Sequence, residues 1–145
     1  MNDLHRIVYV SRNDLDHDDP RLANDLEQIL TASRRNNAAV GVTGALMYHR
    51  NCFAQVLEGT HDAISTVFER IQCDERHSRI ELLSFEPVKR RRFADWSMAY
   101  TGPVDTALPY FDHFLASDRD AISYFTGQDV EALIHHRLLA AHAVA

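Results

Sequence analysis

The sequence predicts an α+β fold in which two helices cover one face of a mixed β-sheet. Segments rich in β-branched and aromatic residues alternate with segments whose apolar residues recur at helical spacing. In chain order these segments give β-α-β-β-α-β-β, which is the ferredoxin-like order with one further strand. Because each helix is apolar along one stripe only, both are expected to bury that stripe against the sheet. The remainder of the chain is expected to add C-terminal helices.

The first strand and the first helix open the predicted domain. Residues 7–11 are β-branched and aromatic, as in a strand. The helix is expected to begin at Asp19 and Pro20, because aspartate suits an N-cap and proline suits the first helical position. It is expected to fade near residues 36–37, an asparagine pair with low helix propensity and high turn propensity.

A hairpin and a second helix follow. Residues 41–48 and 52–57 are two strands separated by a short polar turn. Thr60 can cap the next helix, because its hydroxyl can accept from a backbone N–H of the first turn. That helix is expected to end near residues 74–77. Its apolar face consists of Ile64, Val67, Phe68 and Ile71.

Two strands and a helical tail complete the prediction. Residues 80–85 and 96–100 are the last two strands, and the basic run 89–92 between them is interpreted as a solvated turn. Residues 103–145 are predicted to form a helical extension that packs on the exposed sheet face or on a neighbouring subunit. This extension is too short to be an independent domain, so residues 1–102 are the expected domain.

Charge and composition exclude several classes of function. A net charge of −6 is unfavourable for a nucleic-acid-binding module, which needs positive charge against phosphates. The two cysteines and nine histidines show no metal-ligand spacing, so no metal site is expected. The N-terminus lacks the order of a signal peptide, and no apolar run is long enough to cross a bilayer. We therefore expect a cytoplasmic protein with neither nucleic-acid nor membrane partners.

Two polar side chains occupy positions that the strand pattern marks as buried. Gln55 shares a strand face with Phe53 and Leu57, because side chains alternate between faces. A buried amide without a hydrogen-bond partner costs about 1–3 kcal/mol. Tyr9 lies in the middle of the first strand. If the two strands are neighbours, the phenol and the amide meet inside the fold.

Other polar residues extend this set. Asn36 and Asn37 lie where the first helix ends, close to the same end of the sheet. Arg70 and Asp74 are four residues apart on the second helix, and from spacing alone a surface ion pair is the simpler interpretation. Together these residues outline a slot of amide donors and acceptors with no strong base or nucleophile. Such a slot favours recognition of a flat, amide-rich heterocycle over acid–base chemistry.

Two alternatives stay open at this point. One is a small ferredoxin-like enzyme, such as an acylphosphatase-like hydrolase or an oxygenase, since a fold alone does not fix a function. The other is a purely structural dimerisation or ligand-binding module.

Several motifs in the same order resemble one family. The segments concerned are Tyr9 to Ser11 and residues 35–37, 41–48, 53–59, 70–77 and 92–98. Through them the chain is similar, over roughly residues 4–101, to BLUF domains, the sensors of blue light using FAD.

The resemblance implies non-covalent FAD in a domain of residues 1–102, with the flavin ring between the two helices and over the sheet. Asn37 would bond the pyrimidine edge of the ring and Ile29 would pack against its face. The cofactor-binding residues implied by the resemblance are Ile29, Asn36, Asn37, Gln55, Arg70, Asp74 and His77.

The resemblance also implies a photochemical cycle and a route for its output. Tyr9 would give an electron to the excited flavin and a proton would pass through Gln55, whose amide would end rotated or tautomerised. Trp96 and Met98 would relay this change along the last strand to the C-terminal helices. The output would then reach a downstream effector or alter a homo-oligomer, and the chain would not be an enzyme in its own right.

Overall fold

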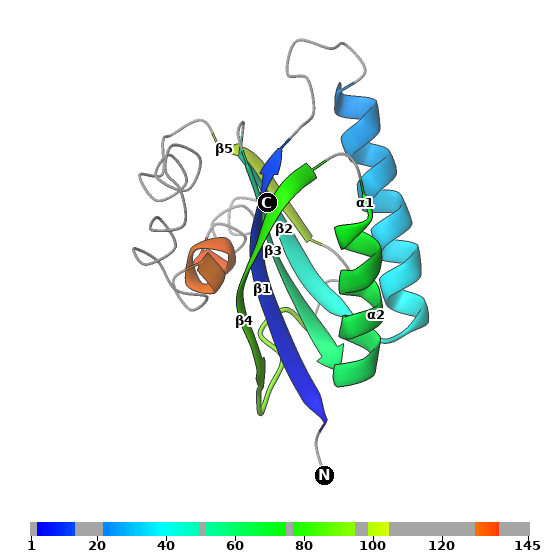
Figure 1. The fold of residues 1–145 in the computed structure, drawn as a ribbon, viewed down its shortest axis with the longest axis vertical. Coiled ribbons are helices and arrows are strands. Elements are labelled where there is room, and N and C mark those ends of the chain that lie inside the picture. Colours follow the sequence, from blue (N-terminus) through cyan, green and yellow to red (C-terminus); the bar gives the residue numbers. More distant parts are fainter. Residues whose placement is uncertain are drawn as a thin grey trace.

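The computed structural model describes residues 3–13, 22–49, 52–74, 77–94, 99–104 and 130–136. The strands are β1 (Leu4–Asn13), β2 (Thr43–His49), β3 (Cys52–Thr60), β4 (His77–Pro87) and β5 (Ala99–Val104). They form a five-stranded sheet in the order β4-β1-β3-β2-β5, antiparallel except for β5, which runs parallel to β2. The helices α1 (Leu22–Ala39) and α2 (His61–Gln72) cover one face of this sheet (Figure 1). The predicted ferredoxin-like order with one further strand is therefore confirmed.

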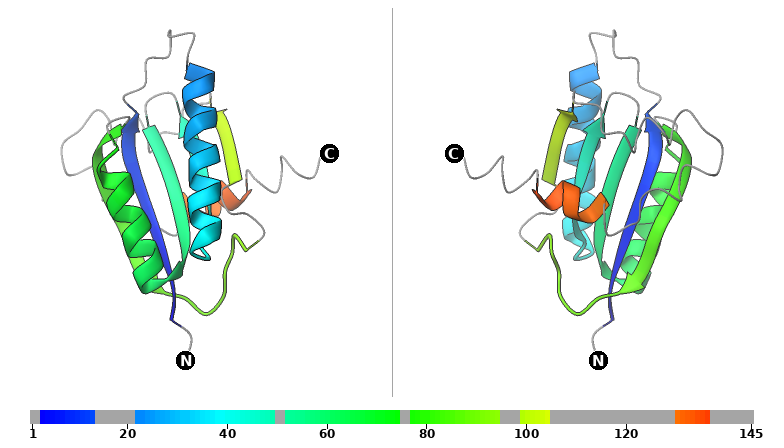
Figure 2. Two further views of the ribbon diagram at one scale, coloured as in Figure 1. Left: turned by 90° about the vertical axis from the view of Figure 1, so that its right-hand side faces the viewer. Right: turned by 90° about the vertical axis from the view of Figure 1, so that its left-hand side faces the viewer.

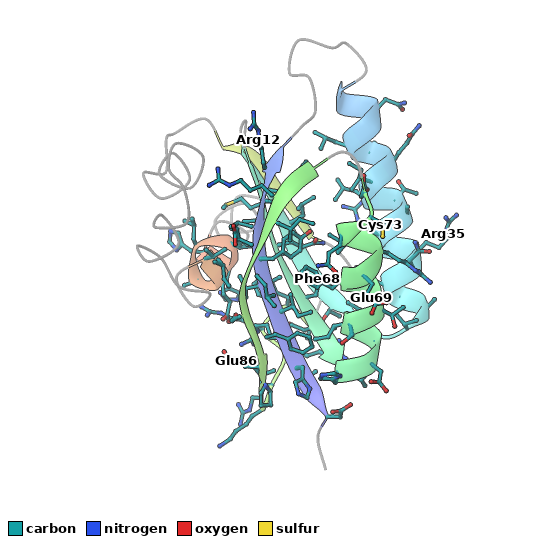
Figure 3. All side chains as sticks on the ribbon, viewed as in Figure 1. Arg12, Arg35, Phe68, Glu69, Cys73 and Glu86 are labelled. Atoms are coloured by element: carbon teal, nitrogen blue, oxygen red, sulfur yellow. The ribbon has the colours of Figure 1, made fainter. Side chains whose placement is uncertain are left out.

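Helix α2 begins and packs as its sequence predicts. Thr60 is the N-cap, and its Oγ1 accepts a hydrogen bond from the Ala63 N–H at 3.2 Å. The apolar stripe of the helix is buried, and Phe68 points from α2 towards the sheet (Figure 3). The Phe68 ring lies 5.4 Å from the Tyr9 ring, so α2 is anchored directly over the middle of β1.

The end of α1 differs from the prediction. The helix does not fade at residues 36–37 but continues to Ala39. The carbonyl of Asn37 accepts a hydrogen bond from the Val42 N–H at 2.9 Å, which closes the last turn. The chain then reverses at Gly41, whose φ of 71° lies in the left-handed region that glycine adopts without strain.

Strands β3 and β4 are both longer than predicted, because β1 provides a partner along its whole length. Leu4 pairs with Thr60 of β3 at one end of β1, and Asn13 pairs with His77 of β4 at the other. These end segments are polar, so hydropathy did not mark them as strands. None of the described helices has the length and apolarity needed to span a bilayer.

The sheet has a separate apolar core on each face. Between the sheet and the two helices lie Ile7, Tyr9, Leu30, Leu46, Phe53, Leu57, Ile64 and Phe68, among others. On the other face Val8, Val10, Met47, Val56 and Phe93 pack with Val130 and Ile134. The last two belong to a helix of residues 130–136, which lies on the face opposite α1 and α2 (Figure 2). This helix is therefore part of the core of the molecule.

A glycine in β2 sets how closely the hairpin strands approach. A Cβ atom on Gly44 would lie 2.0 Å from the backbone oxygen of Val56, which the β2–β3 ladder holds in place. We expect Gly44→Ala to lower the free energy of unfolding by about 1–3 kcal/mol, measured as a fall in the urea midpoint. Gly59→Ala is the control, because its Cβ would meet methyl groups of Val42 and Ile64 at 3.1 and 3.2 Å, and these can move. A Gly44→Ala protein with an unchanged midpoint would contradict the prediction.

Candidate functional site

A cavity lies between the two helices and the sheet, and both apolar and polar residues line it. The apolar lining consists of Ile29, Ala32, Leu46, Phe53, Val67 and Ile71. The polar lining consists of Tyr9, Ser33, Asn36, Asn37, Gln55, Arg70 and Asp74. The fold thus brings together every cofactor-binding residue expected from the sequence except His77.

The structure describes no side chain for three expected site residues. His77 is the first residue of β4, and its side chain is not among the described ones. Trp96 and Met98 lie in the undescribed segment 95–98, just before β5. The strand predicted over residues 96–100 corresponds to β5, which begins at Ala99. The roles of these three residues stay predictions.

Tyr9 and Gln55 form the centre of the site. They are directly opposite each other in the β1–β3 register, and the Tyr9 hydroxyl donates a hydrogen bond to Gln55 Oε1. Both side chains are buried, with 3% and 5% of their surface exposed. The predicted meeting of a phenol and an amide inside the fold is confirmed, and the pair forms part of the cavity wall.

The surroundings of Tyr9 keep its hydroxyl protonated. Burial raises the pKa of Tyr9 far above its usual range, and the negative charge of Asp74 raises this pKa further. A hydroxyl that does not ionise remains a hydrogen-bond donor. Tyr9 therefore keeps the proton that it donates to Gln55 Oε1 over the physiological pH range.

This raised pKa predicts an alkaline titration. A tyrosine in the unfolded chain ionises at about pH 10. Above that pH the unfolded state gains stability by ionisation while the buried Tyr9 stays protonated, so the free energy of unfolding falls as pH rises. At about pH 11 the native protein should show the same tyrosinate absorbance as a Tyr9→Phe variant, both with bound flavin. In denaturant at the same pH the wild type should show the absorbance of one more tyrosinate than the Tyr9→Phe variant. A difference between the native proteins at this pH would contradict the assignment.

The helix ends place the amide and charged groups around the cavity. Asn37 is only 2% exposed. Its backbone carbonyl accepts the hydrogen bond from Val42 that closes α1, and this bond holds the residue against the cavity. Asn36 and Arg70 are exposed and Asp74 is half-buried, so these three lie towards the mouth. From spacing alone, Arg70 and Asp74 were interpreted as a surface ion pair. In the structure they line the same cavity as Tyr9 and Gln55.

The lining fits an isoalloxazine ring. Such a ring is flat, with an apolar benzenoid half and a pyrimidine edge that carries two carbonyl groups and an N–H. The cavity offers apolar walls for the first half, and amide, guanidinium and carboxylate groups for the edge. The lining is richer in polar groups than that of most ligand pockets, as recognition of a polar ring edge requires.

The sequence analysis missed a set of charged residues on the other sheet face. Glu58 is completely buried, and Glu131 is 6% exposed. Their partners include Arg6 and Arg92, and Arg91 also contacts the sheet. The basic run does lie in a bend and Arg92 is exposed, but Arg91 is half-buried, and the side chains of Arg91 and Arg92 bind Thr43 and Glu131 rather than water alone. The available signal was alternation: Glu58 shares a strand face with the apolar residues Ala54 and Val56, where a carboxylate needs a cationic partner.

Comparison with known proteins gives consistent matches. A family model described as sensors of blue-light using FAD (BLUF) matches residues 4–99. The photoactivated adenylate cyclase subunit beta of Euglena gracilis is 32% identical over 96 residues, which are 66% of this chain and 11% of that protein. The dark-state structure of BlrB, a BLUF protein, has a TM-score of 0.71 and 31% identity, covering 97% of this chain and 98% of that one.

A further solved structure carries a flavin. BlrP1 of Klebsiella pneumoniae, with FMN and cyclic diGMP, has a TM-score of 0.62 and 30% identity, covering 95% of this chain and 34% of that one. The chain thus spans only a small part of the curated cyclase. The family match includes both strands of the Tyr9–Gln55 pair and both helices of the cavity. This chain belongs to the BLUF family, the flavin-binding sensors of blue light.

Proposed function

We propose that this chain binds FAD non-covalently in the cavity and that Tyr9 and Gln55 convert absorbed blue light into a new hydrogen-bond arrangement. The observation that carries the proposal is the buried Tyr9–Gln55 hydrogen bond in the cavity wall. FAD is preferred over FMN because the family description names it, although one similar structure holds FMN. Denaturing the purified protein and identifying the released flavin by chromatography tests this preference.

The bound flavin supplies the absorption of blue light and, once excited, a strong oxidant. Tyr9 is the phenol in the cavity wall, and a phenol that loses an electron becomes a strong acid. Its hydroxyl proton already points at Gln55 Oε1, which is the nearest acceptor. The Gln55 amide has one donating and one accepting end, so rotation or tautomerisation changes which end faces the cavity. Burial of both side chains keeps water from competing for the proton.

The remaining residues hold the ring. Asn37 contributes a buried amide to the pyrimidine edge, with Asn36, Arg70 and Asp74 around the mouth, while Ile29 packs on the ring. His77 is included by family resemblance.

The output is proposed to leave through the C-terminal part of the chain. Residues 1–102 form the flavin-binding domain, and residues 103–145 form the extension that meets a downstream effector or a second copy of the chain. Trp96 and Met98 precede β5 and are proposed to relay the change. The chain acts as a cytoplasmic sensor without catalysis of its own.

The absorption spectrum of the purified protein, before and after blue illumination and through dark recovery, tests the function. A flavin spectrum that shifts slightly to the red and returns supports the proposal. Bound flavin with no reversible shift leaves a flavoprotein with another role. A colourless protein that does not take up added FAD refutes the proposal and reopens the acylphosphatase-like alternative, which an assay with an acyl phosphate would then decide.

Replacement of Asn37 tests the binding site itself. We expect Asn37→Ala to weaken flavin binding by about 5- to 150-fold, because loss of a buried hydrogen-bonding group costs about 1–3 kcal/mol. Asn36→Ala is the matched control and should weaken binding less, because Asn36 is exposed. Both affinities are measured by titrating the apoprotein with FAD. Equal losses in the two variants would contradict the assignment of Asn37.

A further inference from the structure

The two strands that carry Tyr9 and Gln55 carry a second cross-strand pair on their other face. Arg6 of β1 is directly opposite Glu58 of β3, three residues along the same ladder. Because successive side chains point to opposite faces, Tyr9 and Gln55 face the cavity, whereas Arg6 and Glu58 face the helix of residues 130–136. One strand pair therefore connects the photochemical face with the C-terminal face.

Glu58 binds the segment that follows β4. Its carboxylate accepts from Arg6 Nε at 2.8 Å and from the backbone N–H groups of Arg92 and Phe93 at 2.8 and 2.7 Å. Its backbone carbonyl accepts from Arg91 Nη1 at 3.2 Å. Donors from a neighbouring strand and from the following segment thus surround a fully buried carboxylate.

Glu131 joins the helix of residues 130–136 to the same charges. Its Oε1 lies 3.3 Å from Arg6 Nη1 and 3.2 Å from Arg92 Nη1. Arg6 contacts both carboxylates, and Arg92 contacts Glu58 through its backbone and Glu131 through its side chain. We refer to Arg6, Glu58, Arg92 and Glu131 as the ionic cluster, in which two positive and two negative charges balance.

The ionic cluster makes docking of the helix depend on geometry. Apolar contacts of Val130 and Ile134 favour burial but are not directional. Charge-assisted hydrogen bonds weaken steeply with distance and angle, and a buried charge is stable only while paired. A small displacement of β1 against β3 therefore changes the pairing of Arg6 more than it changes the apolar contacts.

We propose that the ionic cluster is a latch that holds the helix of residues 130–136 on the sheet and opens when the hydrogen bonding of Tyr9 and Gln55 changes. The light-dependent part rests on the proposed function, whereas the latch itself does not. Glu131 is not among the residues that line the cavity. In the latch it acts on the output by positioning the helix of residues 130–136.

Hydrogen exchange of the full chain in the dark, measured on the peptide that contains residues 130–136, tests the latch. We expect Glu131→Ala to exchange at least about tenfold faster there, because helix docking loses its charged anchor. Alanine has the highest helix propensity, so faster exchange cannot come from a weaker intrinsic helix. Glu69→Ala, which removes an exposed carboxylate of α2, is the control with the same charge change and should leave this peptide unchanged.

A second variant keeps the test independent of one substitution. Arg92→Met removes the side-chain contact with Glu131 but keeps the backbone N–H that binds Glu58. It should also speed exchange. The double variant should exchange no faster than Glu131→Ala, because that substitution already removes the contact that Arg92→Met removes. Wild-type exchange in both single variants would overturn the latch.

The light-dependent part is tested on the same samples, with the flavin absorbance recorded beside the exchange. Illumination should speed exchange of residues 130–136 in the wild type. In Glu131→Ala the red shift should remain while the light–dark difference in exchange disappears. A wild type that shifts in absorbance with unchanged exchange would overturn the coupling. A wild type without any shift would instead overturn the proposed function, and the dark comparison would still decide whether the latch exists.

Discussion

Tyr9→Phe should abolish the light-induced red shift and leave the flavin bound. Phenylalanine keeps the ring, and its contact with Phe68 at 5.4 Å maintains the packing of α2 on β1. The hydroxyl that donates to Gln55 is lost, and with it both the readily oxidised phenol and the proton that moves. A difference spectrum recorded before and after blue illumination measures the effect, which we expect to be complete.

Substitution of Phe68, the other ring of the contact with Tyr9, controls for an effect of packing alone. Phe68→Leu alters the packing over Tyr9 but leaves the hydroxyl and Gln55 in place, so a red shift should persist. Gln55→Leu should behave like Tyr9→Phe, because the amide that changes state is absent. A Tyr9→Phe protein with a full red shift would show that the response does not start at this pair.

Glu58→Ala should lower the free energy of unfolding by about 3–5 kcal/mol, the usual cost of removing one partner of a buried ion pair. The variant removes the carboxylate that accepts from the N–H groups of Arg92 and Phe93, and it leaves Arg6 with Glu131 as its one remaining carboxylate partner among the described residues. The free energy of unfolding of a domain is typically about 5–15 kcal/mol, so the variant would lose a large part of it. Urea denaturation followed by circular dichroism gives the midpoint and the slope.

The matched variant is Glu69→Ala on the surface of α2, expected to change stability by less than about 0.5 kcal/mol. Glu58→Gln should fall between the two, because its amide oxygen still accepts but carries no charge. If Glu58→Ala were as stable as Glu69→Ala, the carboxylate would not be anchoring the segment after β4.

The order of elements was predictable because hydrophobic alternation and helical periodicity are local signals. The position of Gln55 among apolar residues was also local, and it correctly marked a buried amide that needs a partner. Which partner it has depends on the β1–β3 register, which joins residues 46 positions apart. From the sequence alone, the prediction that Tyr9 and Gln55 meet was therefore conditional: it required their two strands to be neighbours.

The charged cluster was missed for the same reason. Glu58 precedes a glycine and a threonine, a sequence typical of a turn, yet β1 extends β3 past it to Thr60. Arg91 and Arg92 belong to a basic run that is typical of solvent exposure. Their role arises because the end of β4 places them beside a buried carboxylate, and this depends on tertiary structure.

The position of the helix of residues 130–136 has a consequence for engineering. A chimaera that borrows only the stretch matching the family model, residues 4–99, would leave Val8, Val56 and Phe93 without the cover of Val130 and Ile134. Such a graft would present an apolar surface to water and promote aggregation when expressed. A light-responsive module taken from this chain for fusion to another enzyme should therefore continue at least to residue 136.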